Sequence, residues 1–265
     1  MFKIQKNVSL AKYTTFRIGG PAKYFSIIKN KDDLIKTVDF AKSKDLPYFI
    51  LGGGSNLLVS DNGFEGLVIK IQNSKIKIQN ENSKFKIIYV EAGARLSDLV
   101  KFSIEHSSTG LEWAIGIPGT IGGAVQVKAK AFGSDISQSV KEINKIDQII
   151  FSVVLELEKG NREKSKQLIK EYIQKRKETQ PLEYASAGCV FKNPPGQSAG
   201  RLIDQAGLKG TKIGQAMISD KHANFIINLG QAQAQDVIQL INLIKQTIKE
   251  KYQIELEEEI NRLGF

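Results

Sequence analysis

The sequence predicts an α+β fold, because short apolar runs that read as strands are interspersed with amphipathic helical segments. Its 265 residues suffice for two or three compact units, each with a hydrophobic core. An apolar fraction of 41% and a charged fraction of 25% are those of an ordinary globular protein. A glycine-rich loop at 51–60 lies between two strand-like segments and does not open a helix, which argues against a dinucleotide-binding fold.

The first part of the chain is predicted to form a βαβ unit. Residues 22–28 read as a strand, and residues 31–43 read as a helix that Asn30 or Asp32 caps. A short buried strand at 48–51 completes the unit, and its two strands should run parallel with a right-handed crossover.

The loop that follows, LGGGSNLLVS at 51–60, has three consecutive glycines directly after a strand. Glycine tolerates positive φ and lets backbone N–H groups approach a ligand closely. Successive amides in such a turn form a concave anion site, which suits a phosphate or pyrophosphate. The loop is no P-loop, because no Gly-Lys-Ser/Thr follows. For this loop alone, a tight strand-to-strand turn is an equally good explanation.

The middle of the chain continues with strands and one helix. Residues 66–71 and 84–91 read as strands, the polar stretch 72–83 between them as a hairpin, and residues 96–106 as a helix. Residues 133–148 give little indication of structure.

A second glycine-rich segment, GIPGTIGGA, occupies residues 116–124. Pro118 fixes one φ angle, while the four glycines allow φ values that other residues avoid. The backbone of this segment is therefore expected to adopt a specific conformation and not to be merely flexible. Together with 51–60, it provides two loops without side chains that can hold one elongated diphosphate ligand.

The second half is predicted to hold three helices and several strands. The strands are at 148–158, 212–219 and 223–228, and the helices at 162–178, 199–206 and 234–251, of which the last is amphipathic and covers a sheet. The tail, 254–260, alternates apolar and acidic residues as a strand does. Glu255, Glu257 and Glu259 share one face, where repulsion is costly unless a cation or a site uses it.

Two further places carry candidate functional groups. Arg176 lies at the end of the helix 162–178, from which it can point into a cleft. The only cysteine, Cys189, is near Lys192, whose ammonium would favour the thiolate or stabilise an anionic substrate. A lone cysteine is, however, more often a small buried hydrophobic residue.

Composition narrows the class of protein. The N-terminus lacks the apolar stretch of a signal peptide, and no apolar run approaches the roughly 20 residues of a membrane span. One cysteine predicts a reducing cytoplasm. The net charge of +10 could steer an anionic ligand, but the lysines are spread along the chain, so we favour a general lysine bias. Without a basic block interleaved with aromatic residues, nucleic-acid binding is not expected.

Seven segments occur in an order that resembles one enzyme family. They are TTFRIGGPA (14–22), LGGGSNLLVSDNGFEGLVI (51–69), GLEWAIGIPGTIGGAV (110–125), SAGCVFKNP (186–194), AGRLIDQAGLKG (199–210), ISDKHANFIIN (218–228) and the acidic tail. The chain thereby resembles the UDP-N-acetylenolpyruvoylglucosamine reductases, flavoenzymes of peptidoglycan precursor synthesis, over nearly its whole length.

This resemblance implies an FAD-binding domain of the vanillyl-alcohol-oxidase type in two subdomains, 1–71 and 72–160, and a C-terminal α+β substrate-binding domain, 161–265. NADPH would reduce FAD, which would then deliver hydride to C3 of the enolpyruvyl ether of UDP-N-acetylglucosamine. The expected partner is this UDP-sugar; no nucleic acid, membrane or metal is expected, and the chain is expected to be a monomer. The implied FAD-binding residues are Gly52, Gly53, Gly54, Ser55, Asn56, Leu57, Pro118, Gly119, Thr120, Gly122 and Gly123.

The resemblance also implies the catalytic groups. Cys189 occupies the position of the family's proton-donating serine, and a thiol yields its proton more readily than an alcohol. Glu259 matches the catalytic glutamate of the tail. Lys192 and Asn193 would contact substrate, and Arg176 is a further candidate for substrate binding.

Two departures from the family pattern are visible. Lys128 and Lys130 replace an asparagine and a glycine after the second glycine-rich segment. The stretch from Gly133 to Ile149 is too short for the strands and the Tyr-Arg-x-Ser motif that the family places there, and whose arginine helps to stabilise the enolate. Arg176, Lys128 or Lys130 could substitute for it. These departures leave an alternative: a flavin- or nucleotide-binding homologue with impaired catalysis.

Overall fold

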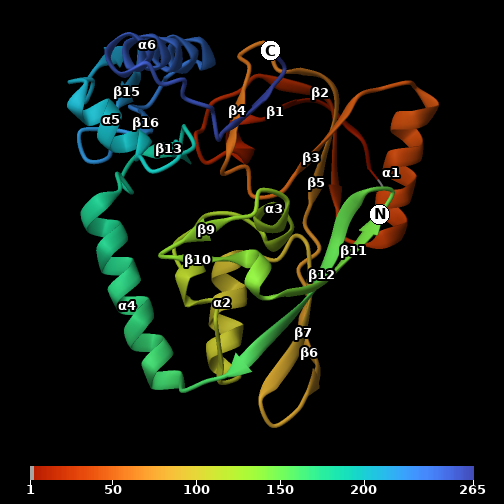
Figure 1. Cartoon of the computed structure of the whole chain (residues 1–265). Coiled ribbons are helices and arrows are strands. Elements are labelled where there is room, and N and C mark those ends of the chain that lie inside the picture. The colour runs from red at the N-terminus through yellow and green to blue at the C-terminus, as the bar shows by residue number, and fades with distance from the viewer. Residues whose placement is uncertain (1–2) are drawn as a thin grey trace. The chain divides into compact units, whose positions relative to one another are not determined.

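The computed structural model describes residues 3–265, which form two compact units (Figure 1). The first unit contains residues 3–5, 24–53 and 66–176, and the second contains residues 6–23, 54–65 and 177–265. Each unit is therefore assembled from separated stretches of chain. The predicted functional division at residues 71 and 160 stays a prediction.

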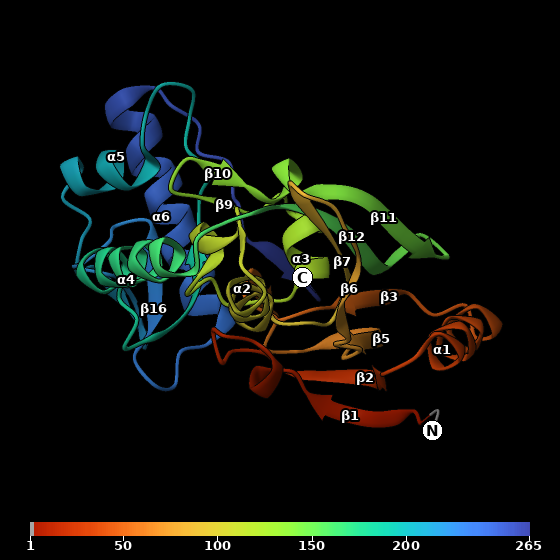
Figure 2. The same cartoon turned by 90° about the horizontal axis from the view of Figure 1, so that it is seen from below.

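The first sheet has four strands, which Figure 2 shows side by side. Their order is β1 (Gln5–Ser9), β2 (Pro21–Ile28), β5 (Phe64–Ile71) and β3 (Tyr48–Leu51). Helix α1 (Lys31–Ser43) follows β2 and begins at Asn30, whose side chain accepts a hydrogen bond from the Asp33 amide at 2.9 Å. The strands and helix predicted here are confirmed. However, β5 lies between β2 and β3, so the two strands of the predicted βαβ unit are not neighbours.

The second sheet is antiparallel and contains five strands. The order is β11 (Val140–Ile146), β12 (Ile149–Lys159), β7 (Phe85–Glu91) and β6 (Ile76–Glu81), and the short β8 (Ser108–Thr109) also pairs with β12. The stretch 72–83 was predicted to form a hairpin by itself, but it contributes a single strand, β6, which forms a hairpin with β7. Strand β11 was not predicted, and two residues with positive φ, Asp147 (48°) and Gln148 (66°), connect it to β12. Positive φ at both central residues is the geometry of a type I′ hairpin turn.

Helices and short elements pack around this sheet. They are α2 (Leu96–Glu105), α3 (Ile121–Gln126), α4 (Arg162–Thr179), the 3₁₀ turns at Glu112–Ala114 and Ile136–Gln138, and the two-residue strands β9 (Lys130–Ala131) and β10 (Ser134–Asp135). Leu96, Leu99 and Val100 of α2 are buried in one core with Val153 and Leu155 of β12. The apolar spacing in the sequence predicted this face of α2 correctly.

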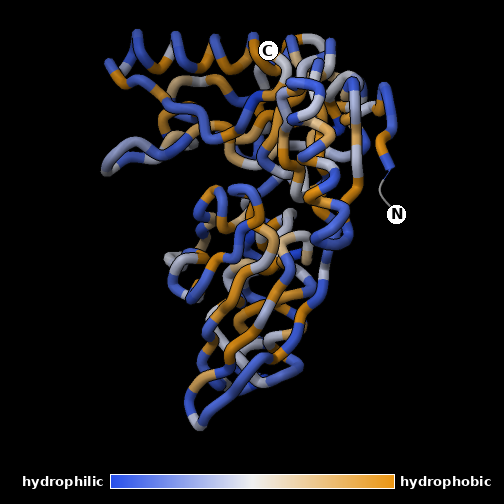
Figure 3. Tube along the Cα trace, turned by 90° about the vertical axis from the view of Figure 1, so that its right-hand side faces the viewer, coloured by the Kyte–Doolittle hydropathy of each residue, from blue (hydrophilic) through white to orange (hydrophobic). Residues whose placement is uncertain are grey.

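The second unit is built on an antiparallel sheet and two helices. The strand order is β13 (Ala185–Cys189), β16 (Phe225–Asn228), β15 (Ala216–Ile218) and β14 (Lys212–Ile213), and the helices are α5 (Ala199–Gln205) and α6 (Ala234–Tyr252). Leu240, Ile241 and Ile244 of α6 are buried against this sheet. In Figure 3, hydrophobic and hydrophilic residues alternate along α6, the long helix at the top, as expected for a helix that covers a sheet.

Two predictions for this unit are wrong in detail. Residues 212–219 form two short strands, β14 and β15, because Gly214 adopts a φ of +53° and turns the chain between them. Residues 254–260 form no strand. The alternation of burial is nevertheless present, with Leu256 and Ile260 both 5% exposed. The regular strand of the tail comes later, as β17 (Asn261–Leu263), which pairs in parallel with β4 (Leu57–Val59). A 3₁₀ turn at Ala11–Tyr13 completes the elements.

Across residues 3–265, none of the helices combines the length and the apolar character needed to span a membrane.

Candidate functional site

The two glycine-rich segments touch each other within the first unit. A Cβ atom added to Gly53 would lie 2.5 Å from Cα of Gly119, and one added to Gly52 would lie 2.8 Å from Oγ1 of Thr120. Real Cβ atoms do not approach other atoms so closely. Glycine at 52 and 53 is therefore required by the contact between the segments, and the structure brings together the two loops that the sequence singled out.

The backbone of this contact leaves hydrogen-bond donors open. The Gly119 carbonyl accepts from the Leu96 amide at 3.1 Å, and the Gly52 carbonyl accepts from the side chain of Lys70. Within residues 3–265, the amides of Gly53 and Gly119 donate to no protein acceptor. Thr120 caps α3 by accepting from the Gly123 amide at 3.4 Å. The segments thus offer unpaired N–H groups and no acidic side chain, which fits the phosphates of FAD.

The rest of the first loop belongs to the second unit, where it is fixed by the chain itself. A Cβ atom on Gly54 would lie 2.1 Å from the Tyr13 carbonyl oxygen, and the Gly54 carbonyl accepts from the Thr15 amide at 3.0 Å. Asn56 donates from its side chain to the Glu259 carbonyl at 3.0 Å. Leu57 is buried and pairs with Asn261. Ser55, between them, is half-buried.

Cys189 ends β13 at an irregular position. The pairing of β13 with β16 shifts between Ser186 and Cys189, and Gly188 has a φ of +79°. This is the signature of a β-bulge, which re-aims the side chain that follows it. Asn224 holds Phe191, two residues further on, because the Asn224 side chain accepts from the Phe191 amide at 2.9 Å and donates to the Phe191 carbonyl at 2.8 Å.

Glu259 lies beside this segment. Phe191 forms an isolated antiparallel bridge with Glu258, and the Glu259 amide donates to the Val190 carbonyl at 2.8 Å. The backbone of Glu259 is therefore hydrogen-bonded to Val190, the residue that directly follows Cys189. The two candidate catalytic residues come together in the second unit although 70 positions separate them in the chain.

The neighbouring Glu258 is held by two cations. Arg262 donates two hydrogen bonds to its carboxylate, at 2.7 and 2.8 Å, and Lys245 also donates to it. Burial by itself raises the pKa of Glu258, but the hydrogen bonds from Lys245 and Arg262 outweigh it and the pKa is lowered. Glu258 is thus a charged anchor for the tail. The sequence placed Glu258 with the apolar face and did not identify this role.

Lys192 and Asn193, the predicted substrate contacts, follow Cys189. The Lys192 ammonium pairs with Glu257, and both side chains are more than half exposed. The side-chain oxygen of Asn193, Oδ1, accepts from the amide of Ala199, the first residue of α5, at 3.0 Å.

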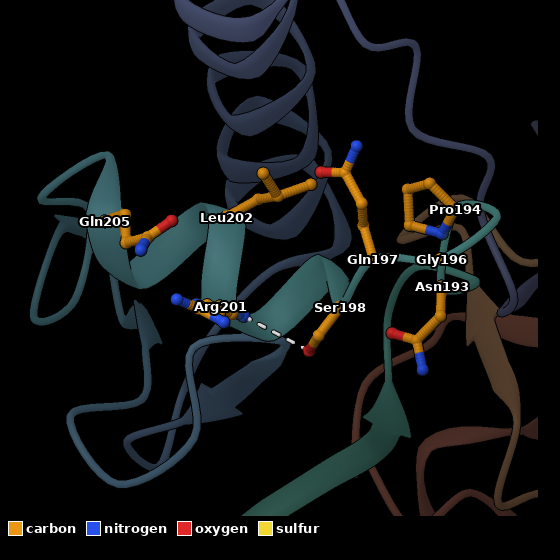
Figure 4. Close-up of a pocket in the computed structure, with 8 residues that line it drawn as sticks. All are labelled: Asn193, Pro194, Gly196, Gln197, Ser198, Arg201, Leu202 and Gln205. Carbon is orange, nitrogen blue, oxygen red and sulfur yellow. Dashed lines mark hydrogen bonds between the residues drawn. The ribbon is translucent and has the colours of Figure 1, made fainter.

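Asn193 also lines a cavity of about 620 Å³, shown in Figure 4. The lining residues are Asn193, Pro194, Gly196, Gln197, Ser198, Arg201, Leu202 and Gln205. All of them belong to α5 or to the loop that leads into it, and most are polar. Polar side chains such as those of Arg201 and Gln197 can bind hydrogen-bonding groups of a ligand there.

Arg176 belongs to the first unit and is only 7% exposed. Its guanidinium carbon lies 5.0 Å from the centre of the Phe132 ring, and Nη2 donates to the Trp113 carbonyl at 3.3 Å. A Cβ atom on Gly116 would lie 2.9 Å from its Cδ. Arg176 is thus a buried cation packed against the start of the second glycine-rich segment, whose Pro118 and Gly122 lie further along.

The two lysines that follow this segment differ in backbone conformation. Lys128 has a φ of +51°, a region in which asparagine is several-fold enriched. Lys130, at the position where the family pattern has a glycine, has no positive φ, so a side chain there carries no backbone strain.

No group of three or more His, Cys, Asp or Glu side chains in the described part of the chain could hold a metal ion.

Two family models match the chain, each over a different range of residues. Residues 22–147 match the model described as FAD binding domain, and residues 180–263 match the C-terminal domain of UDP-N-acetylenolpyruvoylglucosamine reductase.

Individual relatives match over nearly the full length. The chain is 40% identical to the UDP-N-acetylenolpyruvoylglucosamine reductase of Caldanaerobacter subterraneus subsp. tengcongensis, covering 99% of this chain and 94% of that protein. It is 39% identical to the enzyme of the same name from Chlamydia felis, with 100% and 96% covered. These alignments run over 288 positions, more than the 265 residues of this chain, so this chain has gaps in them.

Among solved structures, the UDP-N-acetylenolpyruvylglucosamine reductase of Thermus caldophilus superposes with a TM-score of 0.85 at 33% identity, covering 100% of both chains. A solved protein of the same name therefore has no large segment that this chain lacks.

Proposed function

The chain belongs to the UDP-N-acetylenolpyruvoylglucosamine reductase family, and we propose that it is an FAD-dependent enzyme, UDP-N-acetylmuramate dehydrogenase, which uses NADPH to reduce UDP-N-acetylglucosamine-enolpyruvate to UDP-N-acetylmuramate. The observation that carries this proposal is the contact between the two glycine-rich segments, where open amides and bare backbone can hold a diphosphate. When bound, FAD would supply the hydride, taken from NADPH, that adds at C3 of the enolpyruvyl group.

The protein must supply a proton for C2. As hydride adds at C3, negative charge develops at C2 and on the adjoining carboxylate, and a proton at C2 completes the single bond. We assign the proton to Sγ of Cys189, because a thiol releases its proton more readily than an alcohol and can act as a general acid. Solvent then returns the proton to the sulfur.

Glu259 supports this assignment through its position beside Cys189. Its amide is fixed to the Val190 carbonyl, and its own carbonyl is fixed by Asn56, so the backbone at both residues is constrained. A constrained backbone holds the reacting groups in a fixed position and orientation, and such positioning contributes much of the rate enhancement in catalysis. We propose that the Glu259 carboxylate orients the enolpyruvyl group of the substrate or balances the charge that develops on it.

The cavity beside Asn193 would take the polar part of the substrate. Arg201, Gln197 and Ser198 provide hydrogen-bond donors there, and Lys192 provides a nearby positive charge. A UDP-sugar carries two phosphates and many hydroxyl groups, so these donors match its chemistry.

The contacts of Arg176 indicate that it stabilises the second glycine-rich segment. Its guanidinium is buried on Phe132 and bonded to Trp113, and therefore fixes the segment that begins at Gly116. Substrate binding by Arg176 stays a proposal, as does replacement of the family's missing arginine.

The steady-state assay of NADPH oxidation tests this function. Purified protein loaded with FAD should oxidise NADPH rapidly only when UDP-N-acetylglucosamine-enolpyruvate is present, with one UDP-N-acetylmuramate formed per NADPH consumed. Protein that binds FAD and is reduced by NADPH, but forms no product, would favour the catalytically impaired alternative. The full-length match to the Thermus caldophilus structure gives that alternative no support.

We further propose that the enzyme acts in the cytoplasm, where a cysteine stays reduced and nucleotide-sugar substrates occur. We also propose that it is a monomer. Analytical ultracentrifugation tests the monomer directly.

A further inference from the structure

We propose that Lys70 and Arg95 supply the positive charge that balances the diphosphate of FAD at the two glycine-rich segments. This inference rests on the proposed function, because it names the residues that would neutralise the cofactor there. Neither residue belongs to a glycine-rich segment.

Lys70 reaches the first segment from the neighbouring strand. Along β5, Leu67, Ile69 and Ile71 point into the core that includes α1, so the alternation of side chains directs Lys70 to the opposite face of the sheet. Lys70 is paired with Leu51, the residue just before the first glycine. Its ammonium donates to the Gly52 carbonyl and therefore lies at the edge of the contact between the segments.

Arg95 is connected to the second segment. It directly precedes α2 and forms an antiparallel bridge with Thr120, and the Leu96 amide donates to the Gly119 carbonyl. The same stretch of backbone thus holds Gly119 in place and carries the Arg95 side chain. One cation is associated with each segment.

These two cations have no counter-ion among the residues that the structure describes. Some other lysines of this unit form ion pairs, such as Lys141 with Glu156, whereas Lys70, although partly buried, and Arg95 form none within residues 3–265. Burial, and secondarily the charge of Arg95, lowers the pKa of Lys70. Two cations close enough to affect each other, one of them partly buried, cost free energy until an anion joins them.

A diphosphate satisfies this arrangement. Its oxygens accept from the open amides of Gly53 and Gly119, and its charge pairs with Lys70 and Arg95. A neutral isoalloxazine ring gains nothing from these cations. The inference therefore predicts that the two residues discriminate flavin ligands by their phosphate content.

The experiment compares Lys70→Met with wild type after removal of FAD. Flavin fluorescence should give a dissociation constant for FAD that is raised about tenfold or more, because a charge-assisted contact is lost. The dissociation constant for riboflavin, which has no phosphate, should stay within about twofold. Lys70→Arg should recover most of the FAD affinity. Lys101→Met, which removes an exposed lysine on α2 of the same unit, is the matched control and should leave both constants unchanged.

Thermal unfolding separates this role from a merely structural one. In FAD-free protein, Lys70→Met should unfold at the same or a higher temperature, because it removes a partly buried charge that lacks a counter-ion. Inorganic diphosphate should raise the unfolding temperature of wild type and not that of Lys70→Met.

Two outcomes would overturn the inference: equal losses of FAD and riboflavin affinity, or a lower unfolding temperature of the FAD-free variant with an unchanged response to diphosphate. Failure of wild type to bind FAD would instead contradict the proposed function.

Discussion

Gly53 and Gly119 approach each other so closely that the contact can be tested with one methyl group. In Gly53→Ala, the new Cβ would lie 2.5 Å from Cα of Gly119, so the two segments must separate. Overpacking of this kind costs about 1–3 kcal/mol. We expect a lower midpoint in urea unfolding and a clear loss of FAD affinity, measured by equilibrium denaturation and flavin fluorescence.

Gly123→Ala is the matched comparison for stability. Its Cβ would meet only Oγ1 of Thr120, at the ordinary contact distance of 3.6 Å, and Gly123 lies within α3 without positive φ. Alanine in a helix is favourable relative to glycine. The urea midpoint should therefore be unchanged or raised. A similar loss of stability in both variants would show that the separation of the segments is not the cause.

Cys189 offers a second test at the level of one residue. In Cys189→Ala, reduction of the flavin by NADPH should proceed at the wild-type rate, because the proton is needed only in the later half of the reaction. Turnover of the enolpyruvyl substrate should fall by about 10² to 10⁴-fold, the usual contribution of a positioned acid. Rapid-mixing absorbance of the flavin separates the two half-reactions. Unchanged turnover would remove Cys189 from the mechanism, and Cys189→Ser should retain part of the rate.

At the scale of elements, a buried carboxylate ties α4 to the loop before the second glycine-rich segment. Glu112 is 5% exposed and accepts hydrogen bonds from Thr109 at 2.7 Å, from the Gly110 amide at 2.8 Å and from Ser165 of α4. Burial by itself raises the pKa of Glu112, but these hydrogen bonds outweigh it and the pKa is lowered.

This network predicts a pH-dependent contribution to stability. Because the pKa of Glu112 is lower in the folded than in the unfolded protein, its contribution is complete above the unfolded value near 4.5 and is lost as pH falls through the folded value. Glu112→Gln should therefore lower the unfolding temperature at pH 7, and the difference from wild type should shrink below pH 4.5. Calorimetry at several pH values measures it. A difference that is independent of pH would assign the effect to hydrogen-bond geometry alone.

Elements with a strong apolar period were predictable from the sequence, and those fixed by distant partners were not. Helices α1, α2 and α6 follow from their own spacing and caps, which are local properties. Strand β11 was missed because its turn, Asp147-Gln148, contains no glycine although both residues have positive φ. The tail alternates in burial, as its sequence indicates. However, Glu258 is the only residue of 254–260 that forms a β-bridge, with Phe191, and a sequence pattern does not report such a partner.

The candidate site shows the same division. The two glycine-rich segments could be identified from their composition, and the resemblance to the family indicated Cys189 and Glu259 as catalytic residues. Lys70 could not be identified from the sequence, because its position near the first glycine-rich segment depends on the pairing of β5 with β3. The ion pairs of Glu258 were missed for a similar reason, since one of its partners, Lys245, comes from a different element, α6.

At the scale of the whole molecule, the two units have separate hydrophobic cores. Leu240 is fully buried in the core of the second unit, and Leu99 is fully buried in a core of the first. Replacing either leucine by alanine leaves a cavity that costs about 2–5 kcal/mol. If each unit is its own cooperative structure, this loss should remain within the unit that carries the substitution.

Hydrogen exchange measured by mass spectrometry decides this. Leu240→Ala should accelerate exchange in residues 177–265 and leave residues 66–176 close to wild type, and Leu99→Ala should do the reverse. Each variant serves as the control for the other, since both remove the same number of atoms from a fully buried position. Flavin fluorescence should also respond more to Leu99→Ala, because the same core includes Ile121 and Ala124 of the second glycine-rich segment and its helix. Faster exchange throughout both units in either variant would mean that the chain unfolds as a single cooperative structure.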